Sequence, residues 1–179
     1  MEKKYLEELK MSETMTVKKW WWVWEYEEEL RWLNSMAMQG WTLDKVSFPS
    51  YHFIKTEPGE YIISLEMRQK DEEYISFMRE LNAEYIGRVT SWIYFRRKAE
   101  YGDFDIFSDI DSKITHLNRI SKMLSIVCYA NLTIGVANSF NPTINIGFIN
   151  LLGGALLAYA LGRIHSKEAD LKYERSIRE

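Results

Sequence analysis

The last third of the chain contains a long apolar run. From Met123 to Gly162 the sequence has no Asp, Glu, Lys, Arg or His. About 20 apolar residues, rising about 1.5 Å each, cross the hydrocarbon core of a bilayer, so this run is long enough for two membrane spans. The segment 138–142, NSFNP, interrupts it, and Pro and Asn favour a turn. The pattern therefore predicts a two-helix transmembrane hairpin over residues 123–162, with spans of about 120–138 and 143–164.

Basic residues flank this run at the ends away from the turn, where the chain carries Arg119, Lys122, Arg163, His165 and Lys167. Because cations next to spans stay on the cytoplasmic side, the hairpin predicts a multi-pass protein of the cell membrane with both termini in the cytoplasm. The first 19 residues contain no apolar signal-peptide segment.

A buried helical hairpin in a soluble core is the alternative to a membrane hairpin. The first span favours this alternative, because it contains the polar residues Ser125, Asn131 and Thr133. Two uncharged segments in tandem, both flanked by cations, are unusual in a soluble fold. The membrane interpretation is therefore the stronger of the two.

Small or amide side chains recur every fourth residue in the second span, at Asn150, Gly154, Ala158 and Gly162. This spacing places them on one helical stripe, where small side chains let two helices approach closely in lipid. The amide of Asn131 in the first span also needs a partner in hydrocarbon. The stripe predicts packing between the two spans, between neighbouring chains in an oligomer, or both. A pore built from several hairpins stays a further alternative.

The residues on either side of the hairpin read as helices. Residues 101–122 predict an amphipathic juxtamembrane helix that continues into the first span, with Asp103 or Ser108 as its N-cap. Its apolar stripe consists of Phe107, Ile110, Ile114, Leu117 and Leu124. The stripe packs either against the same chain's cytoplasmic domain or in a coiled-coil stalk. Residues 163–179 predict a charged cytoplasmic helical tail with Glu168–Lys172 and Glu174–Arg178 pairs.

Residues 17–100 alternate between strand and helix patterns and follow a leader at 1–16. Strands are predicted at 17–24, 41–48, 51–56, 60–67, 84–87 and 91–97, and helices at 25–39 and 71–81. The order βαβββαββ indicates a cytoplasmic α+β sandwich of ferredoxin-like type with both helices on one sheet face. The first strand is apolar on both faces, which favours a central or covered position.

Three motifs carry a resemblance to a known family. They are ELRWLNSMAMQGWTL at 29–43, EPGEY at 57–61 and WIYFRR at 92–97. Together they resemble the bacterial domain-of-unknown-function family 2812 over about residues 17–98. The resemblance implies hydrophobic segments after the domain and genes beside PadR-type regulators, with no established activity and no catalytic residue. Asn82-Ala83 departs from the family's Gly-Trp, although Asn tolerates the left-handed backbone of a helix end.

The aromatic residues suggest one candidate ligand site. Trp20, Trp22 and Trp24 lie on one face of the predicted first strand. Such a cluster is typical of a cage for a cationic or apolar ligand. The alternatives are that these side chains form core or face lipid at the membrane interface.

Composition excludes several classes of protein. The single cysteine, Cys128, rules out a disulfide framework, and the net charge of −3 gives no case for nucleic acid. His52, His116 and His165 are too dispersed for a metal triad, and no phosphate loop or hydrolase elbow occurs. The acidic run Glu25–Glu29 predicts a solvated helix start, and Arg96-Arg97-Lys98 a solvated strand edge or a contact to anionic lipid.

We therefore expect no enzyme, no cofactor and no metal. The sequence predicts a membrane-anchored cytoplasmic binding or regulatory module whose partners are the lipid bilayer and a protein or small ligand. The alternative is a structural subunit of a membrane homo-oligomer, as a pore, effector or transporter accessory.

Overall fold

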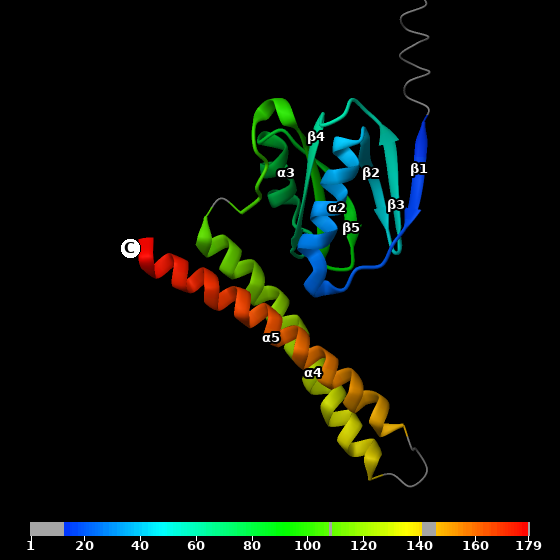
Figure 1. The fold of residues 1–179 in the computed structure, drawn as a ribbon, viewed down its shortest axis with the longest axis vertical. Coiled ribbons are helices and arrows are strands. Elements are labelled where there is room, and N and C mark those ends of the chain that lie inside the picture. Colours follow the sequence, from blue (N-terminus) through cyan, green and yellow to red (C-terminus); the bar gives the residue numbers. More distant parts are fainter. Residues whose placement is uncertain (1–12, 108, 141–145, 179) are drawn as a thin grey trace, which may run out of the picture. The chain divides into compact units, whose positions relative to one another are not determined.

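The computed structural model describes residues 13–107, 109–140 and 146–178. They belong to two compact units, and the first ends at Ile106 and the second begins at Phe107. The first unit is an α+β fold, and the second consists of two long helices (Figure 1).

The first unit has the predicted order of strands and helices, βαβββαββ, with two added 3-10 turns. Its elements are β1 (Thr14–Lys18), η1 (Val23–Glu25), α2 (Tyr26–Met38), β2 (Trp41–Ser47), β3 (Ser50–Lys55), β4 (Tyr61–Met67), α3 (Glu72–Glu80), β5 (Ala83–Val89), β6 (Trp92–Lys98) and η2 (Ala99–Tyr101). The predicted α+β class is confirmed.

The six strands form two antiparallel sheets, in the orders β1-β3-β2 and β4-β6-β5. Strands β2 and β5 lie against each other where the sheets meet. Arg96 of β6 bridges this junction, because its guanidinium donates to Glu84 Oε2 at 2.7 Å and to the carbonyl of Leu43 at 3.1 Å. Gly87 lets the strands approach, since a Cβ there would lie 3.2 Å from Val46 Cγ1.

The first strand differs from its prediction in place and in role. It ends at Lys18, so residues 20–22 follow it as a loop. Among the described strands it lies at the edge of its sheet and pairs with β3. The backbone N–H of Lys19 donates to the carbonyl of Pro49 at 3.0 Å, and the chain then turns into η1. The prediction of a central or covered strand over 17–24 is wrong beyond Lys18, because the tryptophans that follow pack without strand pairing.

The two helices lie on opposite faces of the second sheet, which corrects the expectation of one common face. Tyr94 of β6 donates its hydroxyl to Glu29 of α2. The next residue, Phe95, packs instead in one core cluster with Ile75 and Met78 of α3. Successive strand residues point to opposite faces, so the sheet lies between α2 and α3.

Left-handed backbone positions end both helices as the sequence predicts. Gly40 follows α2 with φ +80°, and a Cβ there would lie 2.9 Å from the carbonyl oxygen of Thr56. Asn82 follows α3 with φ 60°. Asn is one of the few residues with a side chain that tolerates this conformation, so the missing glycine leaves the turn intact.

The second unit contains α4 (Ile110–Ser139) and α5 (Gly147–Arg178). Helix α4 runs without a break from the predicted juxtamembrane segment into the predicted first span. Its N-cap is Asp109, whose carboxylate accepts from the backbone N–H of Ser112 at 2.6 Å. Asp103 therefore does not cap this helix, and Ser108 lies outside the described residues.

Helices α4 and α5 pack as an antiparallel pair. Three hydrogen-bonded contacts along the pair are Asp111–Arg175 at 2.8 Å, Ser121–His165 at 2.8 Å and Cys128–Gly154 at 3.4 Å. The charged tail is thus the continuation of α5 and a partner of the start of α4. Its predicted ion pairs Glu168–Lys172 and Glu174–Arg178 are both present. Part of the predicted turn, residues 141–142, lies outside the described residues.

Both helices are long and apolar enough to cross a membrane. Only 28% of the apolar window in α4 and 22% of that in α5 is buried. Large apolar side chains along them are exposed, among them Ile126, Tyr129, Phe148 and Leu152. A helical hairpin in a soluble core would cover such side chains, so the exposure disfavours that alternative.

Candidate functional site

The structure brings the predicted tryptophans together, although not on a strand. Trp22 stacks on Trp24 with ring centroids 5.0 Å apart, and Trp20 meets Trp22 edge-on at 5.7 Å. Trp20 also contacts Phe48, from the β2–β3 turn, at 5.0 Å. Trp20 is 57% and Trp22 50% exposed, so this aromatic group lies at the surface.

Beneath this group lies a cavity of about 190 Å³, which we call the aromatic pocket. Its walls are Lys19, Trp20, Trp21, Trp22, Val23, Tyr26, Glu29, Phe48, Tyr51, Val89, Thr90, Trp92 and Tyr94. Trp24 does not line the cavity; it supports Trp22 by stacking. Exposed rings form the rim, whereas Tyr51, Trp92, Tyr94 and Glu29 are buried.

Among the described residues that line the aromatic pocket, Glu29 has the only carboxylate. It is only 7% exposed, and its Oε1 accepts hydrogen bonds from the hydroxyls of Tyr51 and Tyr94, both at 2.7 Å. The prediction of a solvated acidic run is therefore wrong at this residue. The sequence spacing indicated this burial, because Glu29 precedes Leu33 by four residues and Ala37 by eight and therefore lies on the inward face of the helix.

Burial sets the protonation of this group. It raises the pKa of Glu29 above its ordinary value of 4.5, and the hydrogen bonds from Tyr94 and Tyr51 oppose this increase. Burial also raises the pKa values of Tyr51 and Tyr94, and the Glu29 carboxylate adds to the increase. Both phenols therefore keep their protons and stay donors at physiological pH.

A second buried glutamate in the same unit has a different environment. Glu66 accepts from the hydroxyl of Tyr74 at 2.8 Å, and the guanidinium of Arg68 lies 3.6 Å from its other oxygen. Glu29, by contrast, has only hydroxyl donors among the described residues, and both use Oε1. Its Oε2 is therefore the acceptor left for another group.

One wall of the aromatic pocket has an uncommon backbone. Thr90, in the β5–β6 turn, adopts φ +53°. A β-branched residue in this region costs of order 1–3 kcal/mol and persists only where its surroundings hold it. The next wall residue, Trp92, stacks on Tyr26 with centroids 5.5 Å apart.

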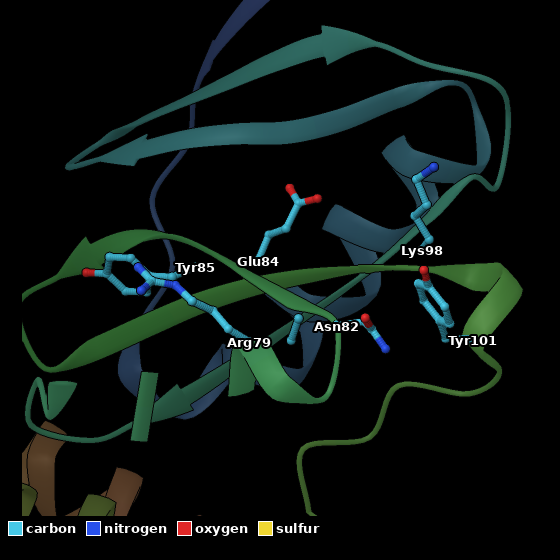
Figure 2. Close-up of a pocket in the computed structure, with 7 residues that line it drawn as sticks. Arg79, Asn82, Glu84, Tyr85, Lys98 and Tyr101 are labelled. Carbon is cyan, nitrogen blue, oxygen red and sulfur yellow. The ribbon is translucent and has the colours of Figure 1, made fainter. Parts of the chain in front are cut away.

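A larger cavity of about 460 Å³ lies at the other end of β5 (Figure 2). Its lining is Arg79, Asn82, Ala83, Glu84, Tyr85, Lys98 and Tyr101. Figure 2 shows Arg79 and Tyr85 at one end of this cavity, Asn82 and Tyr101 at the other, and Glu84 between them. The carboxylate of Glu84 is paired with Arg96, so these side chains do not converge on one empty point.

The basic run predicted as a solvated edge or a lipid contact is engaged within the first unit. Arg96 binds Glu84 and Asp44, and Arg97 donates to the carbonyl of Asp103 at 2.6 Å. Lys98 lies 4.0 Å from Glu60.

The described residues contain no group of three His, Cys, Asp or Glu side chains that could hold a metal ion.

The predicted small-residue stripe is divided between two surfaces. Gly154 is in the contact between the helices, because a Cβ there would lie 2.5 Å from Leu132 Cδ2. Ala158 and Gly162 are exposed, and a Cβ on Gly162 would meet no atom within 4 Å. Asn150 is half-buried. Asn131 donates to the carbonyl of Val127 at 2.9 Å in its own helix.

Comparison with known proteins gives one match. Residues 25–129 match the family described as "Protein of unknown function (DUF2812)". The matched region covers most of the first unit and extends into α4. No curated protein and no solved structure matches the chain.

Proposed function

The chain belongs to the DUF2812 family of proteins of unknown function, and we propose that it is a membrane-anchored binding module. In this proposal the α+β unit binds a small ligand in the aromatic pocket, and the helices α4 and α5 hold it at the cytoplasmic face of the membrane. The buried Glu29 carboxylate in the wall of an aromatic-walled cavity carries the proposal.

The length and surface of the helical pair support the anchor. Helices α4 and α5 have 30 and 32 residues. At about 1.5 Å per residue each exceeds the roughly 30 Å of a hydrocarbon core, so the charged ends extend beyond it on one side. Arg119, Lys122, Arg163 and Lys167 lie at those ends, which favours the cytoplasm for both termini.

The chemistry of the aromatic pocket supports ligand binding. Ligand sites are mostly apolar concavities with a few convergent polar groups, often with perturbed pKa values. The aromatic pocket has apolar walls, one carboxylate and a strained wall residue, Thr90. The larger cavity of Figure 2 has more volume, but its carboxylate Glu84 is already paired.

Two measurements test the proposal on the full-length chain. Alkaline carbonate extraction should leave the protein in the membrane pellet; recovery in the aqueous fraction contradicts the anchor. In detergent, at least one of benzylamine, benzyl alcohol and benzoate should raise the melting temperature. The rise should be lost in a Trp20→Ala/Trp22→Ala variant that melts like the wild type without probe. If none of the three raises it, the ligand site is wrong.

A second candidate function is a structural subunit of a membrane homo-oligomer. The exposed small residues Ala158 and Gly162 favour it, because they leave part of the α5 stripe open to another helix. Native mass spectrometry should then show an oligomer that Gly162→Leu dissociates. A monomer in both proteins would rule this function out.

A further inference from the structure

We propose that the ligand of the aromatic pocket is a small organic cation, an amine or quaternary ammonium group on an apolar body, whose charge is held by Glu29 and whose body contacts the tryptophan rim. This inference rests on the proposed function, because it names the chemical class of ligand for the same site.

The charge of the ligand follows from the environment of Glu29. Burying a carboxylate is costly unless a cation and hydrogen bonds compensate for its lost hydration. Glu66 has such a cation, since Arg68 lies 3.6 Å away. Glu29 is buried to a similar extent, but among the residues that the structure describes its hydrogen bonds come from Tyr51 and Tyr94 alone. A ligand cation at Oε2 would supply the charge that Arg68 supplies to Glu66.

The walls of the aromatic pocket suit the same class of ligand. The faces of Trp and Tyr rings attract cations, and rings of this kind surround quaternary ammonium groups in known recognition sites. Trp20, Trp22 and Tyr26 bring such rings to the pocket. The Lys19 ammonium in the wall already lies over the rings of Trp21, another wall residue, and Trp32, at 4.2 and 4.7 Å, and the rings of Trp20, Trp22 and Tyr26 are distinct from these two.

The volume of the aromatic pocket limits the size of the ligand. A cavity of about 150 Å³ accommodates benzene, whereas drug-sized ligands need about 300 Å³ or more. The aromatic pocket has about 190 Å³. It therefore takes a group of benzylammonium size, either as a free amine or as the cationic head of a longer molecule whose remainder lies along the exposed rim.

Binding of such a cation must depend on pH. Other titratable groups in the wall are Lys19, Tyr26, Tyr51 and Tyr94, and burial raises the pKa of each of these tyrosines. Glu29 is thus the wall group that changes charge in the acid to neutral range. A permanently charged ligand should bind more tightly as pH rises and Glu29 loses its proton.

The test uses the full-length protein in detergent and titrates it with benzyltrimethylammonium, benzyl alcohol and benzoate by isothermal calorimetry. We expect the cation to bind at least about tenfold more tightly than the other two, with an affinity that rises from pH 4 to pH 8. Glu29→Gln should lower that affinity by at least about tenfold and remove its pH dependence. Glu28→Gln removes the same charge one residue away, at a residue that pairs with Arg31 and does not line the aromatic pocket, and should lower the affinity much less than Glu29→Gln does.

Each other result overturns the inference. If benzyl alcohol or benzoate binds as tightly as the cation, the aromatic pocket is a ligand site of another class, and the proposed function survives. If all three fail to bind, the inference and the ligand site of the proposed function are both wrong. Should Glu29→Gln fail to fold, the variant Trp20→Ala/Trp22→Ala replaces it. Loss of these exposed rings is expected to lower the affinity for the cation more than the affinity for benzyl alcohol. Equal losses for both probes would contradict the inference.

Discussion

The side chain of Asn34 binds both backbone groups of Ile63. Its Nδ2 donates to the carbonyl of Ile63 at 2.9 Å, and its Oδ1 accepts from the N–H of the same residue at 2.9 Å. Ile63 lies on β4, at the edge of the second sheet. Unpaired edge groups favour pairing with other chains, so Asn34 covers an aggregation-prone edge and fixes α2 to the sheet.

Replacing this amide should destabilise the first unit. In Asn34→Ala the N–H and carbonyl of Ile63 lose their partners in a part-buried place, which costs about 2–3 kcal/mol of unfolding free energy. The tryptophan bands of the near-UV circular dichroism spectrum report on this unit selectively, because all seven tryptophans lie before Ile106. Ser35→Ala removes only an exposed bond to the carbonyl of Trp32 and should cost less than about 0.5 kcal/mol. Equal losses in the two variants would contradict this role of Asn34.

Glu29 should give the stability of the first unit a distinct dependence on pH. Its pKa is raised in the folded state, so the folded chain keeps this proton to higher pH than the unfolded chain. The stabilisation that protonated Glu29 gives the folded unit is complete below pH 4.5, and it is lost as pH rises through the raised pKa of the folded state. The difference in melting temperature between wild type and Glu29→Gln should therefore fall from pH 4 to pH 8, measured without ligand.

Tyr94→Phe is the matched test of this dependence. The hydroxyl of Tyr94 lowers the pKa of Glu29, so its removal should move the loss of stability to higher pH. A melting-temperature difference between wild type and Glu29→Gln that stays constant with pH would show that Glu29 titrates alike in the folded and unfolded chain.

Thr90 offers a stabilising substitution. Its left-handed backbone, φ +53°, strains a β-branched side chain that is exposed. Asn adopts this conformation at lower cost, so Thr90→Asn should raise the unfolding free energy by about 1 kcal/mol. Asn82→Ala is the reverse change at φ 60° and should lower it by a similar amount. The strain argument fails if thermal melting shows Thr90→Asn to be neutral while Asn82→Ala destabilises.

The order of the elements was predictable because it depends on local signals. Gly40 and Asn82 mark helix ends, and the alternation of apolar residues marks the strands. The place of the first strand was not predictable, because the run from Trp20 to Trp24 has the composition of a strand but packs ring against ring. Strand propensity reports a fit to a half-buried surface, and these rings find such a surface without a ladder.

The candidate site was predictable only in part. The tryptophan cluster stands out in the sequence, whereas its carboxylate is concealed in a run of four similar residues. Only Glu29 of that run faces Tyr51 and Tyr94, which lie 22 and 65 residues away in the chain. Contacts at such separations depend on the tertiary fold, and a single sequence contains no local signal for them.

The two glycines of the α5 stripe should respond differently to a large side chain. Gly154 faces α4, where a Cβ would lie 2.5 Å from Leu132 Cδ2, while a Cβ on Gly162 would meet nothing within 4 Å. Gly154→Leu should therefore separate α4 from α5 and lower the free energy of unfolding of the second unit by about 2–3 kcal/mol. Gly162→Leu should not lower it, because the new side chain meets no atom within 4 Å of its Cβ and leucine has a higher helix propensity than glycine. Cysteine accessibility measures this directly: Cys128 is buried beside Gly154, so a thiol reagent should label it faster in Gly154→Leu than in wild type or Gly162→Leu. Equal labelling in all three proteins would mean that the helices do not pack through Gly154.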